Sequence, residues 1–378
     1  MPPRSTIVIV TAMLAALHAY IGIRLLPGLP VAASFKWAGA VWLALSFLLM
    51  PLGLLARGIR DEALADRLAW IGLTAMGLFS SLLVLTFLRD LALIVGWVFD
   101  GLSAGFVADS ALAVVAASAL VTLAGFFNAT RLAKVVDVEV PLENLPPALD
   151  GFTIAQISDI HIGPTIKGRY LERIVERVNG LDADIVAVTG DLVDGSVEQL
   201  AKHTAPLAKL EAKHGAYFVT GNHEYYSGAP AWIAEVQRLG LTVLMNEHVV
   251  VEHGGARLVV AGVTDYSAHH FDPAQRSDPH AAIKGAPEDA GVRVLLAHQP
   301  RTAEAASAAG FDLQLSGHTH GGQFLPWNLF VPLQQPYTAG LHKLRELWIY
   351  VSRGTGYWGP PKRFGAPSEI TRLKLVAT

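Results

Sequence analysis

Long apolar stretches dominate the first third of the chain. Four of them precede residue 130, at about 6–23, 38–55, 68–88 and 106–127. A helix needs about 20 apolar residues to cross the hydrocarbon core of a bilayer. We therefore expect each stretch to form a membrane-spanning helix, and residues 1–134 to form an all-α transmembrane domain of about four helices.

From about residue 131 onward, short apolar runs alternate with amphipathic stretches. Runs of this length are typical of buried strands in an open α/β sheet, and they occur at 152–158, 185–189, 217–220, 292–297 and 312–315. Residues 171–178 and 232–239 repeat apolar side chains at helical spacing, and a glycine follows each stretch. Further strands are expected at 249–252, 257–261, 347–351 and 370–376, and the excess of strands over helices indicates a second sheet. We therefore expect residues 135–378 to form an α/β domain.

The composition differs between the first third of the chain and the rest, and it excludes some classes of binding partner. Hydrophobic residues make up 52% of the chain and charged residues 16%, and only 13 charged residues lie in the first 130 positions. The net charge of −3 gives no basic field for a phosphate backbone, so nucleic acid is not expected as a partner. The chain has no cysteine, which excludes disulfides, zinc fingers, iron–sulfur clusters and thiol nucleophiles.

Basic residues around the apolar stretches predict on which side of the membrane the α/β domain lies. Six flank the stretches on the side of the amino terminus: Arg4, Arg57, Arg60, Arg67, Arg131 and Lys134. Three lie on the opposite side: Arg24, Lys36 and Arg89. Because short cytoplasmic loops are rich in Lys and Arg, we expect a multi-pass protein of the cell (inner) membrane with its α/β domain in the cytoplasm.

Polar side chains follow the buried strands, at the point where each strand ends. The residues that follow the five runs are Asp159 and His161, then Asp191, then Asn222, His223 and Glu224, then His298, and finally His318 and His320. Ligands bind at this edge in open α/β sheets. We therefore expect five separate segments to deliver carboxylate, amide and imidazole groups to one crevice.

These oxygen and nitrogen donors suit divalent metal ions. Manganese is expected, with iron or zinc as alternatives, and the number of imidazoles argues against calcium. Two ions about 3.5–4 Å apart that share a carboxylate and a hydroxide would stabilise the attacking and leaving oxygens of an in-line displacement at phosphorus. Asp191 is the natural bridge, because it lies centrally in the order and follows a glycine that lets the backbone pass close to the ions.

The order of these segments resembles the calcineurin-like metallophosphoesterase superfamily. Its pattern D-x-H, G-D, G-N-H-[DE], H and G-H-x-H appears here without substitution, within about residues 135–378. Residues 317–323 (GHTHGGQ) and 363–369 (RFGAPSE) are similar to the membrane-associated branch of that superfamily. The resemblance implies a four-layer αββα sandwich with two mixed sheets.

The resemblance also implies a role for each polar residue. One metal ion would be bound by Asp159, His161, Asp191 and His320, and the other by Asp191, Asn222, His298 and His318. His223 would protonate the leaving oxygen or steady the transferring phosphoryl group. Asp194 and Glu224 would orient ligand imidazoles from outside the ligand set.

Two arginines and one apolar segment bear on the substrate. Arg353 and Arg363 would either clamp a phosphate-rich substrate or pair with surface carboxylates. The apolar segment would either contact a lipid chain or lie in the core, which we favour, and it contains Trp327, Leu329, Phe330 and Val331.

Together these features predict a membrane-anchored hydrolase with a dinuclear metal centre. A metal-bridging hydroxide would attack a phosphoester or pyrophosphate bond in line. Anchoring favours a lipid-linked substrate, because such a substrate never leaves the bilayer surface. Two alternatives are an anchored phosphodiesterase of soluble nucleotides and a non-catalytic binding module that keeps the fold.

Overall fold

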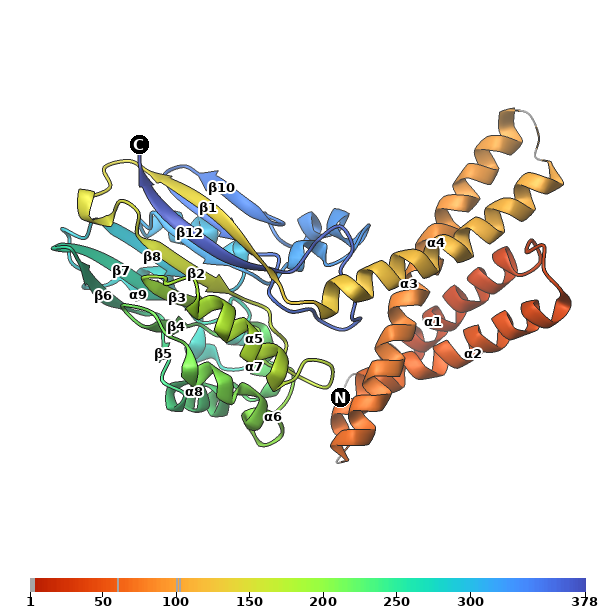
Figure 1. Ribbon diagram of the computed structural model, residues 1–378, viewed down its shortest axis with the longest axis horizontal. Coiled ribbons are helices and arrows are strands. Elements are labelled where there is room, and N and C mark those ends of the chain that lie inside the picture. The colour runs from red at the N-terminus through yellow and green to blue at the C-terminus, as the bar shows by residue number, and fades with distance from the viewer. Residues whose placement is uncertain (1–3, 60, 100, 102) are drawn as a thin grey trace. The chain divides into compact units, whose positions relative to one another are not determined.

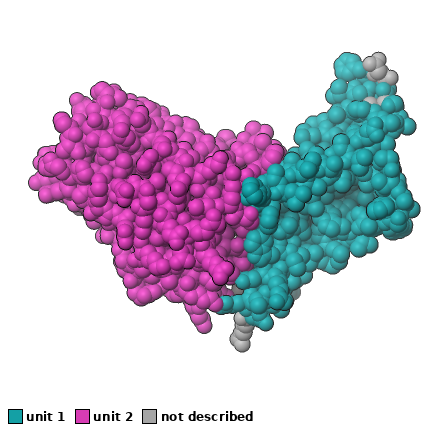
Figure 2. All heavy atoms as spheres, in the orientation of Figure 1, with its two compact units in different colours: residues 1–127, 359–362 teal, residues 128–358, 363–378 magenta. Residues whose placement is uncertain are grey.

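The structure is a computed structural model that describes residues 4–59, 61–99, 101 and 103–378. The chain divides into two compact units, which Figure 2 colours separately. One unit comprises Met1–Phe127 together with Gly359–Lys362, and the other comprises Asn128–Trp358 together with Arg363–Thr378. Arg60, one of the basic residues in the charge comparison, lies outside the described residues.

Long helices form the first unit. They are α1 (Arg4–Leu25), α2 (Ala33–Leu55), α3 (Glu62–Phe99) and α4 (Ala104–Thr130), labelled in Figure 1. Each contains one of the four predicted apolar stretches, and each is long and apolar enough to cross a membrane. With 38 and 27 residues, α3 and α4 exceed the about 20 that a span requires.

Two of these helices approach closely where their side chains are small. α2 and α3 meet at Gly53 and Gly72, and a Cβ on Gly72 would lie 2.3 Å from the Leu49 carbonyl oxygen. Small residues of this kind allow helix backbones to pack together in a membrane. A larger side chain at either glycine would force the two helices apart.

Several polar side chains inside the first unit form hydrogen bonds with one another or with the backbone. His18 Nε2 lies 2.8 Å from Ser46 Oγ. Lys362, from the short Gly359–Lys362 segment, is buried and donates hydrogen bonds to the Gly77 carbonyl and the Ser81 hydroxyl. These contacts satisfy polar groups that would be costly to leave unpaired in apolar surroundings.

Two six-stranded sheets form the centre of the second unit (Figure 1). The first has the order β1-β12-β2-β3-β4-β5 and consists of β1 (Lys134–Leu142), β12 (Glu369–Ala377), β2 (Thr153–Ile157), β3 (Ile185–Val188), β4 (Ala216–Phe218) and β5 (Thr242–Val243). The second has the order β10-β11-β9-β8-β7-β6 and consists of β10 (Gly340–Leu344), β11 (Leu347–Val351), β9 (Leu313–Ser316), β8 (Val292–Leu296), β7 (Ala256–Gly262) and β6 (Glu247–His253). Both are mixed: β2 pairs parallel to β3 but antiparallel to β12, and β7 pairs parallel to β8 but antiparallel to β6.

Three apolar cores hold the layers of this unit together. Ile154 of β2 and Val260 of β7 pack between the two sheets. Their neighbours Ala155 and Ala261 belong to the two outer cores, because successive side chains of a strand alternate between its faces. The outer cores are covered by α5 (Gly168–Asn179), α6 (Val197–Thr204) and α8 (Ala229–Arg238) on one side and by α9 (Pro279–Ile283) and α10 (Ala303–Ala308) on the other. The predicted αββα sandwich with two mixed sheets is confirmed.

A buried carboxylate joins the starts of two neighbouring strands. Asp184, just before β3, accepts hydrogen bonds from the Thr153 backbone nitrogen at 2.7 Å and its hydroxyl at 2.9 Å, at the start of β2. The Lys213 ammonium lies 2.8 Å from its other oxygen. Burial raises the pKa of Asp184, but the hydrogen bonds from Lys213 and Thr153 outweigh this effect, and the pKa lies below its ordinary value.

Replacing this carboxylate should weaken the sheet in a pH-dependent way. Because the folded-state pKa of Asp184 is lowered, its contribution is fully present above the ordinary carboxyl pKa and is lost as the pH falls through the folded value. We expect Asp184→Asn to cost about 1–3 kcal/mol of unfolding free energy at pH 7. The measurement is the thermal unfolding midpoint of the full chain in detergent at pH 7 and pH 3.

Lys213→Met serves as the matched control. Because the Lys213 side chain is 62% exposed, its ion pair with Asp184 is screened by water. We expect Lys213→Met to lower the midpoint less than Asp184→Asn does. An equal loss in both variants would assign the stabilisation to the ion pair rather than to the hydrogen bonds from Thr153.

Candidate metal centre

Loops that leave strands of both sheets bring the predicted ligands together. The loops after β2, β3 and β4 in the first sheet and after β8 and β9 in the second carry Asp159, His161, Asp191, Asn222, His298, His318 and His320. The helix α7 (Asn222–Ser227) begins at Asn222 itself. Loops from both sheets are therefore needed to form the centre.

Five of the predicted ligand residues have a left-handed backbone. The φ angle is +54° at Asp159, +55° at His161, +52° at Asp191, +69° at His318 and +52° at His320. L-residues rarely adopt this conformation, although Asp and His tolerate it better than most. Such backbone persists only where the surrounding structure holds it, and it is frequent at functional sites.

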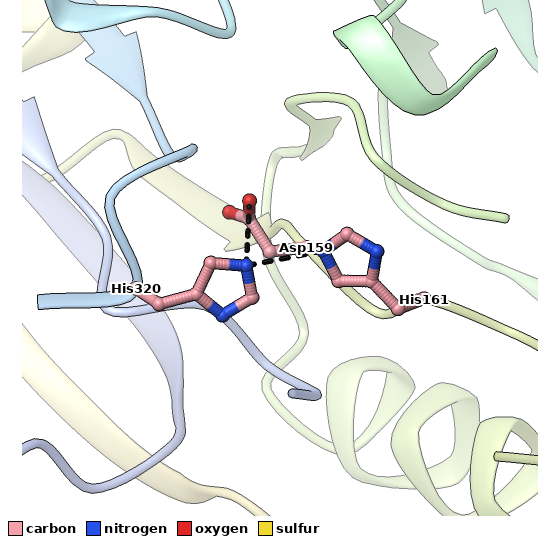
Figure 3. Close-up of side chains that lie close together, drawn as sticks. All are labelled: Asp159, His161 and His320. Carbon is pink, nitrogen blue, oxygen red and sulfur yellow. Dashed lines mark hydrogen bonds and ion pairs between the residues drawn. The ribbon is translucent and has the colours of Figure 1, made fainter. Parts of the chain in front are cut away.

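One group of buried side chains forms around Asp159. In Figure 3, Asp159, His161 and His320 point toward one another. His320 Nε2 lies 3.0 Å from His161 Nε2 and 3.4 Å from Asp159 Oδ1. One atom from each residue lies within 4.8 Å of the others, so a single metal ion can reach all three.

A second group forms around Asp191. Its Oδ2 atom lies 3.2 Å from His298 Nε2, which in turn lies 3.2 Å from His318 Nδ1. The same oxygen lies 3.8 Å from His161 Nε2 of the first group. Asp191 is therefore within reach of both groups, as a bridging carboxylate must be.

Hydrogen bonds on the far side of two imidazoles fix their orientation. His298 Nδ1 lies 2.8 Å from the Thr189 carbonyl oxygen, which only accepts, so Nδ1 carries a proton and the ring is held by this bond. His161 Nδ1 lies 3.2 Å from Asp194 Oδ1, which holds the second ring in the same way. In both rings Nε2 faces the centre, and this is the nitrogen that a metal ion would bind.

Two neutral imidazoles and one buried amide oxygen fit a divalent metal centre. Burial and the neighbouring His298 lower the pKa of His318 to about 3, and burial and Arg363 lower the pKa of His320 well below its ordinary value. Both imidazoles are thus neutral, the form that binds metals. Among the described residues, the buried Asn222 Oδ1 has no hydrogen-bond partner, and a metal ion would satisfy it.

His223 lies beside the two groups, and one of its ring nitrogens contacts a carboxylate. Its Nδ1 lies 2.5 Å from Asp194 Oδ1, and its Nε2 lies 3.9 Å from Asp191 Oδ2. Burial lowers the pKa of His223, but the charges of Asp191, Asp194 and Glu224 outweigh this effect and raise it above the ordinary value. Asp194 therefore orients both His161 and His223.

Glu224 orients backbone and not the imidazole rings that we expected. Its carboxylate accepts hydrogen bonds from the backbone nitrogens of Asp191, Leu192 and Gly221 at 3.0, 2.8 and 2.6 Å. A fully buried carboxylate that collects three backbone donors fixes the two loops that carry Asp191 and Asn222 against each other.

Both arginines bind groups inside the domain and do not pair with surface carboxylates. Arg363 is fully buried and donates hydrogen bonds to the carbonyls of His320, Gly356 and Ala366. Its Nη2 lies 3.0 Å from His320 Nδ1. Because the guanidinium donors are already engaged, Arg363 supports a ligand loop and is not free to clamp a phosphate.

Arg353 is held by a carboxylate from inside the domain. Its Nη1 lies 2.9 Å from Oε2 of Glu369, which is 1% exposed. The prediction that Arg353 pairs with a surface carboxylate is therefore wrong, because Glu369 is a buried strand residue. The arginine side chain itself is about one-third exposed.

Aromatic rings beside His223 were not predicted from the sequence. The rings of Tyr226 and Trp358 lie edge-on to His223, with centroids 5.2 and 5.7 Å away, and Phe271 lies 5.6 Å from Tyr226. These three aromatic residues, which we call the aromatic wall, are each about half exposed or more. In the sequence, these residues are marked only by positions near His223 or near turns. Such positions alone do not indicate a functional role.

Comparison with known proteins gives a consistent picture. The family model described as calcineurin-like phosphoesterase matches residues 152–322. The chain is 37% identical to "Transmembrane protein with metallophosphoesterase domain" of Danio rerio, over 73% of this chain and 64% of that protein. It is 40% identical to the protein of the same name from Bos taurus, over 71% of this chain and 62% of that protein.

A bacterial relative is covered almost completely. The chain is 32% identical to an uncharacterized metallophosphoesterase of Aquifex aeolicus, over 65% of this chain and 93% of that protein. By contrast, the match spans somewhat less than two thirds of the length of the two vertebrate relatives.

A close approach at Gly221 provides a test of how tightly the centre is built. A Cβ on Gly221 would lie 2.2 Å from Asp191 Oδ1 and 2.6 Å from the Asp191 nitrogen, so either the carboxylate or its loop would have to move. We expect Gly221→Ala to weaken metal binding about 10- to 100-fold, the usual cost of disturbing a ligand's support. Metal content after dialysis against graded chelator measures this.

Gly180→Ala is the control for the glycine substitution itself. A Cβ on Gly180 would meet its nearest neighbour at an ordinary 3.5 Å, at the end of α5 and away from the centre. We expect this variant to retain metal as the unmodified chain does. Retention of metal by Gly221→Ala as well would show that Asp191 is not confined as the distances indicate.

Proposed function

Because this chain belongs to the calcineurin-like phosphoesterase family, we propose that it is a membrane-anchored hydrolase of a phosphoester or pyrophosphate bond. One observation carries the proposal: metal-ligating side chains gather in adjoining groups around Asp159 and Asp191, and Asp191 is within reach of both. His161, Asp194 and His223 form a further group of this kind. Apolar helices in the same chain make it a membrane protein. The domain boundary is proposed at residues 134 and 135.

The ligand groups divide into two sets that share one carboxylate. Asp159, His161, Asp191 and His320 would hold one divalent ion, and Asp191, Asn222, His298 and His318 the other. Ions bound there would supply Lewis-acid polarisation of a phosphoryl group and a water of lowered pKa. The mixture of imidazole, carboxylate and amide donors favours manganese, with iron or zinc as alternatives.

The protein residues around the ions control orientation and proton transfer. Asp194 holds His223 Nδ1, which leaves Nε2 turned toward the ligand groups. We assign His223 Nε2 the transfer of a proton to the leaving oxygen, because it is the titratable group at the centre that is not in the ligand sets and is partly accessible. Glu224 and Arg363 keep the ligand loops in place.

We favour a lipid-linked substrate over a soluble one. Long apolar helices keep the protein at a bilayer, where a lipid-linked phosphate is always present and a soluble enzyme would have to find it. One observation supports the second candidate, a phosphodiesterase of soluble nucleotides: the exposed aromatic wall beside His223 offers rings on which a base can stack. A non-catalytic binding module is the third reading, and it predicts no turnover.

Removing the shared carboxylate tests the dinuclear centre. We expect Asp191→Asn to lose metal and to abolish turnover, because Asn cannot supply the negative charge that two cations share. The assay is hydrolysis of a bis-aryl phosphodiester by the purified full chain, with manganese restored after chelation, beside elemental analysis. Full activity in this variant would contradict the two-metal proposal.

Replacing the proton donor should separate catalysis from metal binding. We expect His223→Ala to keep both metals and to slow turnover about 10²- to 10⁴-fold, the usual cost of a lost general acid. His280→Ala, at an exposed histidine on α9, should change neither quantity. Loss of metal in His223→Ala would identify it as a ligand, and unchanged turnover would favour the binding module.

Reporter fusions test the side of the membrane on which the domain lies. The excess of basic residues predicts that the C-terminus lies in the cytoplasm. We therefore expect a green fluorescent protein fused after Thr378 to fluoresce in bacterial cells, and a periplasm-dependent alkaline phosphatase fused there to be inactive. The reverse pattern would move the domain to the other face.

A further inference from the structure

The apolar segment after the GHTHGGQ motif lies on the surface. We expected it to lie in the core, and that expectation is wrong. We call residues 325–333 the apolar loop. Its most exposed side chains are Leu329 and Leu333, which are 69% and 80% exposed, and Phe330 is 53% exposed. From residue 321 to residue 341 the sequence contains no charged residue. A contiguous apolar surface of this kind marks an interaction site more often than chance exposure.

Both ends of the apolar loop are fixed to the domain by buried amide side chains. Gln323 exchanges two hydrogen bonds with the backbone of Trp358, at 2.8 and 2.9 Å. Gln335 accepts a hydrogen bond from the Arg301 nitrogen and donates one to Gln299, at 3.2 and 3.0 Å. Short 3-10 turns at Trp327–Leu329 and Val331–Leu333 order the chain between them. The exposed apolar side chains are therefore presented on an ordered frame.

The apolar loop is attached directly to the segments that carry metal ligands. Gln323, just before the loop, follows His320 by three positions. Gln299, which accepts a hydrogen bond from Gln335 just after the loop, follows His298 directly. The apolar loop is therefore held by the same two segments that carry His298, His318 and His320.

The chemistry of the apolar loop fits a bilayer surface. Leucine, tryptophan and phenylalanine are the residues that enter the boundary between headgroups and acyl chains, and the absence of charge removes the main cost of entry. Arg301 donates a hydrogen bond to the Gln334 carbonyl at the end of the loop, and a cation beside an apolar segment suits anionic headgroups. Among the described residues, four helices of the same chain are long and apolar enough to span a membrane.

We propose that the apolar loop inserts into the interfacial region of the bilayer and presents the metal centre to phosphate groups at the lipid surface. This inference rests on the proposed function, because it names how a phosphoester in a lipid would reach the centre. The phosphate to be cleaved then lies at headgroup depth. A substrate that must first dissolve in water is the less suited one.

The absence of cysteine makes a direct test practical. A single Leu333→Cys substitution in the full chain can be labelled with an environment-sensitive fluorophore, after reconstitution into vesicles of phosphatidylcholine and phosphatidylglycerol. We expect blue-shifted emission and at least about twofold quenching by nitroxide-labelled lipids, as for a group buried at the interface. The matched control is Val250→Cys, at a 40% exposed apolar residue of β6, which should show neither effect.

Two results would overturn the inference. Quenching at position 333 that does not exceed quenching at position 250 would show that the apolar loop stays in water. A blue shift that nitroxide lipids do not quench, and that disappears at low protein density in the vesicle, would identify a second copy of the chain as the occupant.

Turnover in the same vesicles separates this inference from the proposed function. Hydrolysis of the bis-aryl phosphodiester needs the metal centre but no contact of the apolar loop with lipid. A labelled chain that is active on this probe but unquenched would refute only the insertion. A chain that is quenched but inactive would refute the proposed function and leave the insertion standing.

Discussion

The structure depends on burying ionisable side chains from both sheets at one place. An isolated buried charge is costly, and the cost is offset only by close partners and hydrogen bonds. Glu224 is one of these buried groups, and it accepts three backbone hydrogen bonds that hold the loops of Asp191 and Asn222 together. The left-handed backbone of the ligand residues is a second sign that the surroundings impose this geometry.

The sequence predicted the parts of the centre that come from chain order. Within each sheet, the residues after the parallel strands had to meet at one edge, because the carboxyl ends of parallel strands lie together. The contacts that support the ligands could not be predicted from the sequence. Arg363 binds His320 across the fold, and Glu224 accepts hydrogen bonds from the backbone and not from a ring. Neither contact follows from spacing, because each depends on how loops from distant segments fold back onto one another.

Exposure was equally hard to predict from the sequence. The uncharged stretch from residue 321 to residue 341 looks the same in sequence whether it fills a core or faces outward. The described members of the three apolar cores come from other segments, and none of them lies in the apolar loop. The aromatic wall likewise leaves apolar side chains exposed, in this case beside His223.

The Gly359–Lys362 segment has a consequence for how such proteins can be recombined. Four residues from near the end of the chain belong to the helical unit, where Lys362 is buried against Gly77 and Ser81. The chain therefore crosses the boundary between units three times, not once. Exchanging the helices for an unrelated membrane anchor would strand a lysine next to Arg363, the residue that supports His320. A fusion at a single boundary would therefore not exchange the helical unit as an independent module.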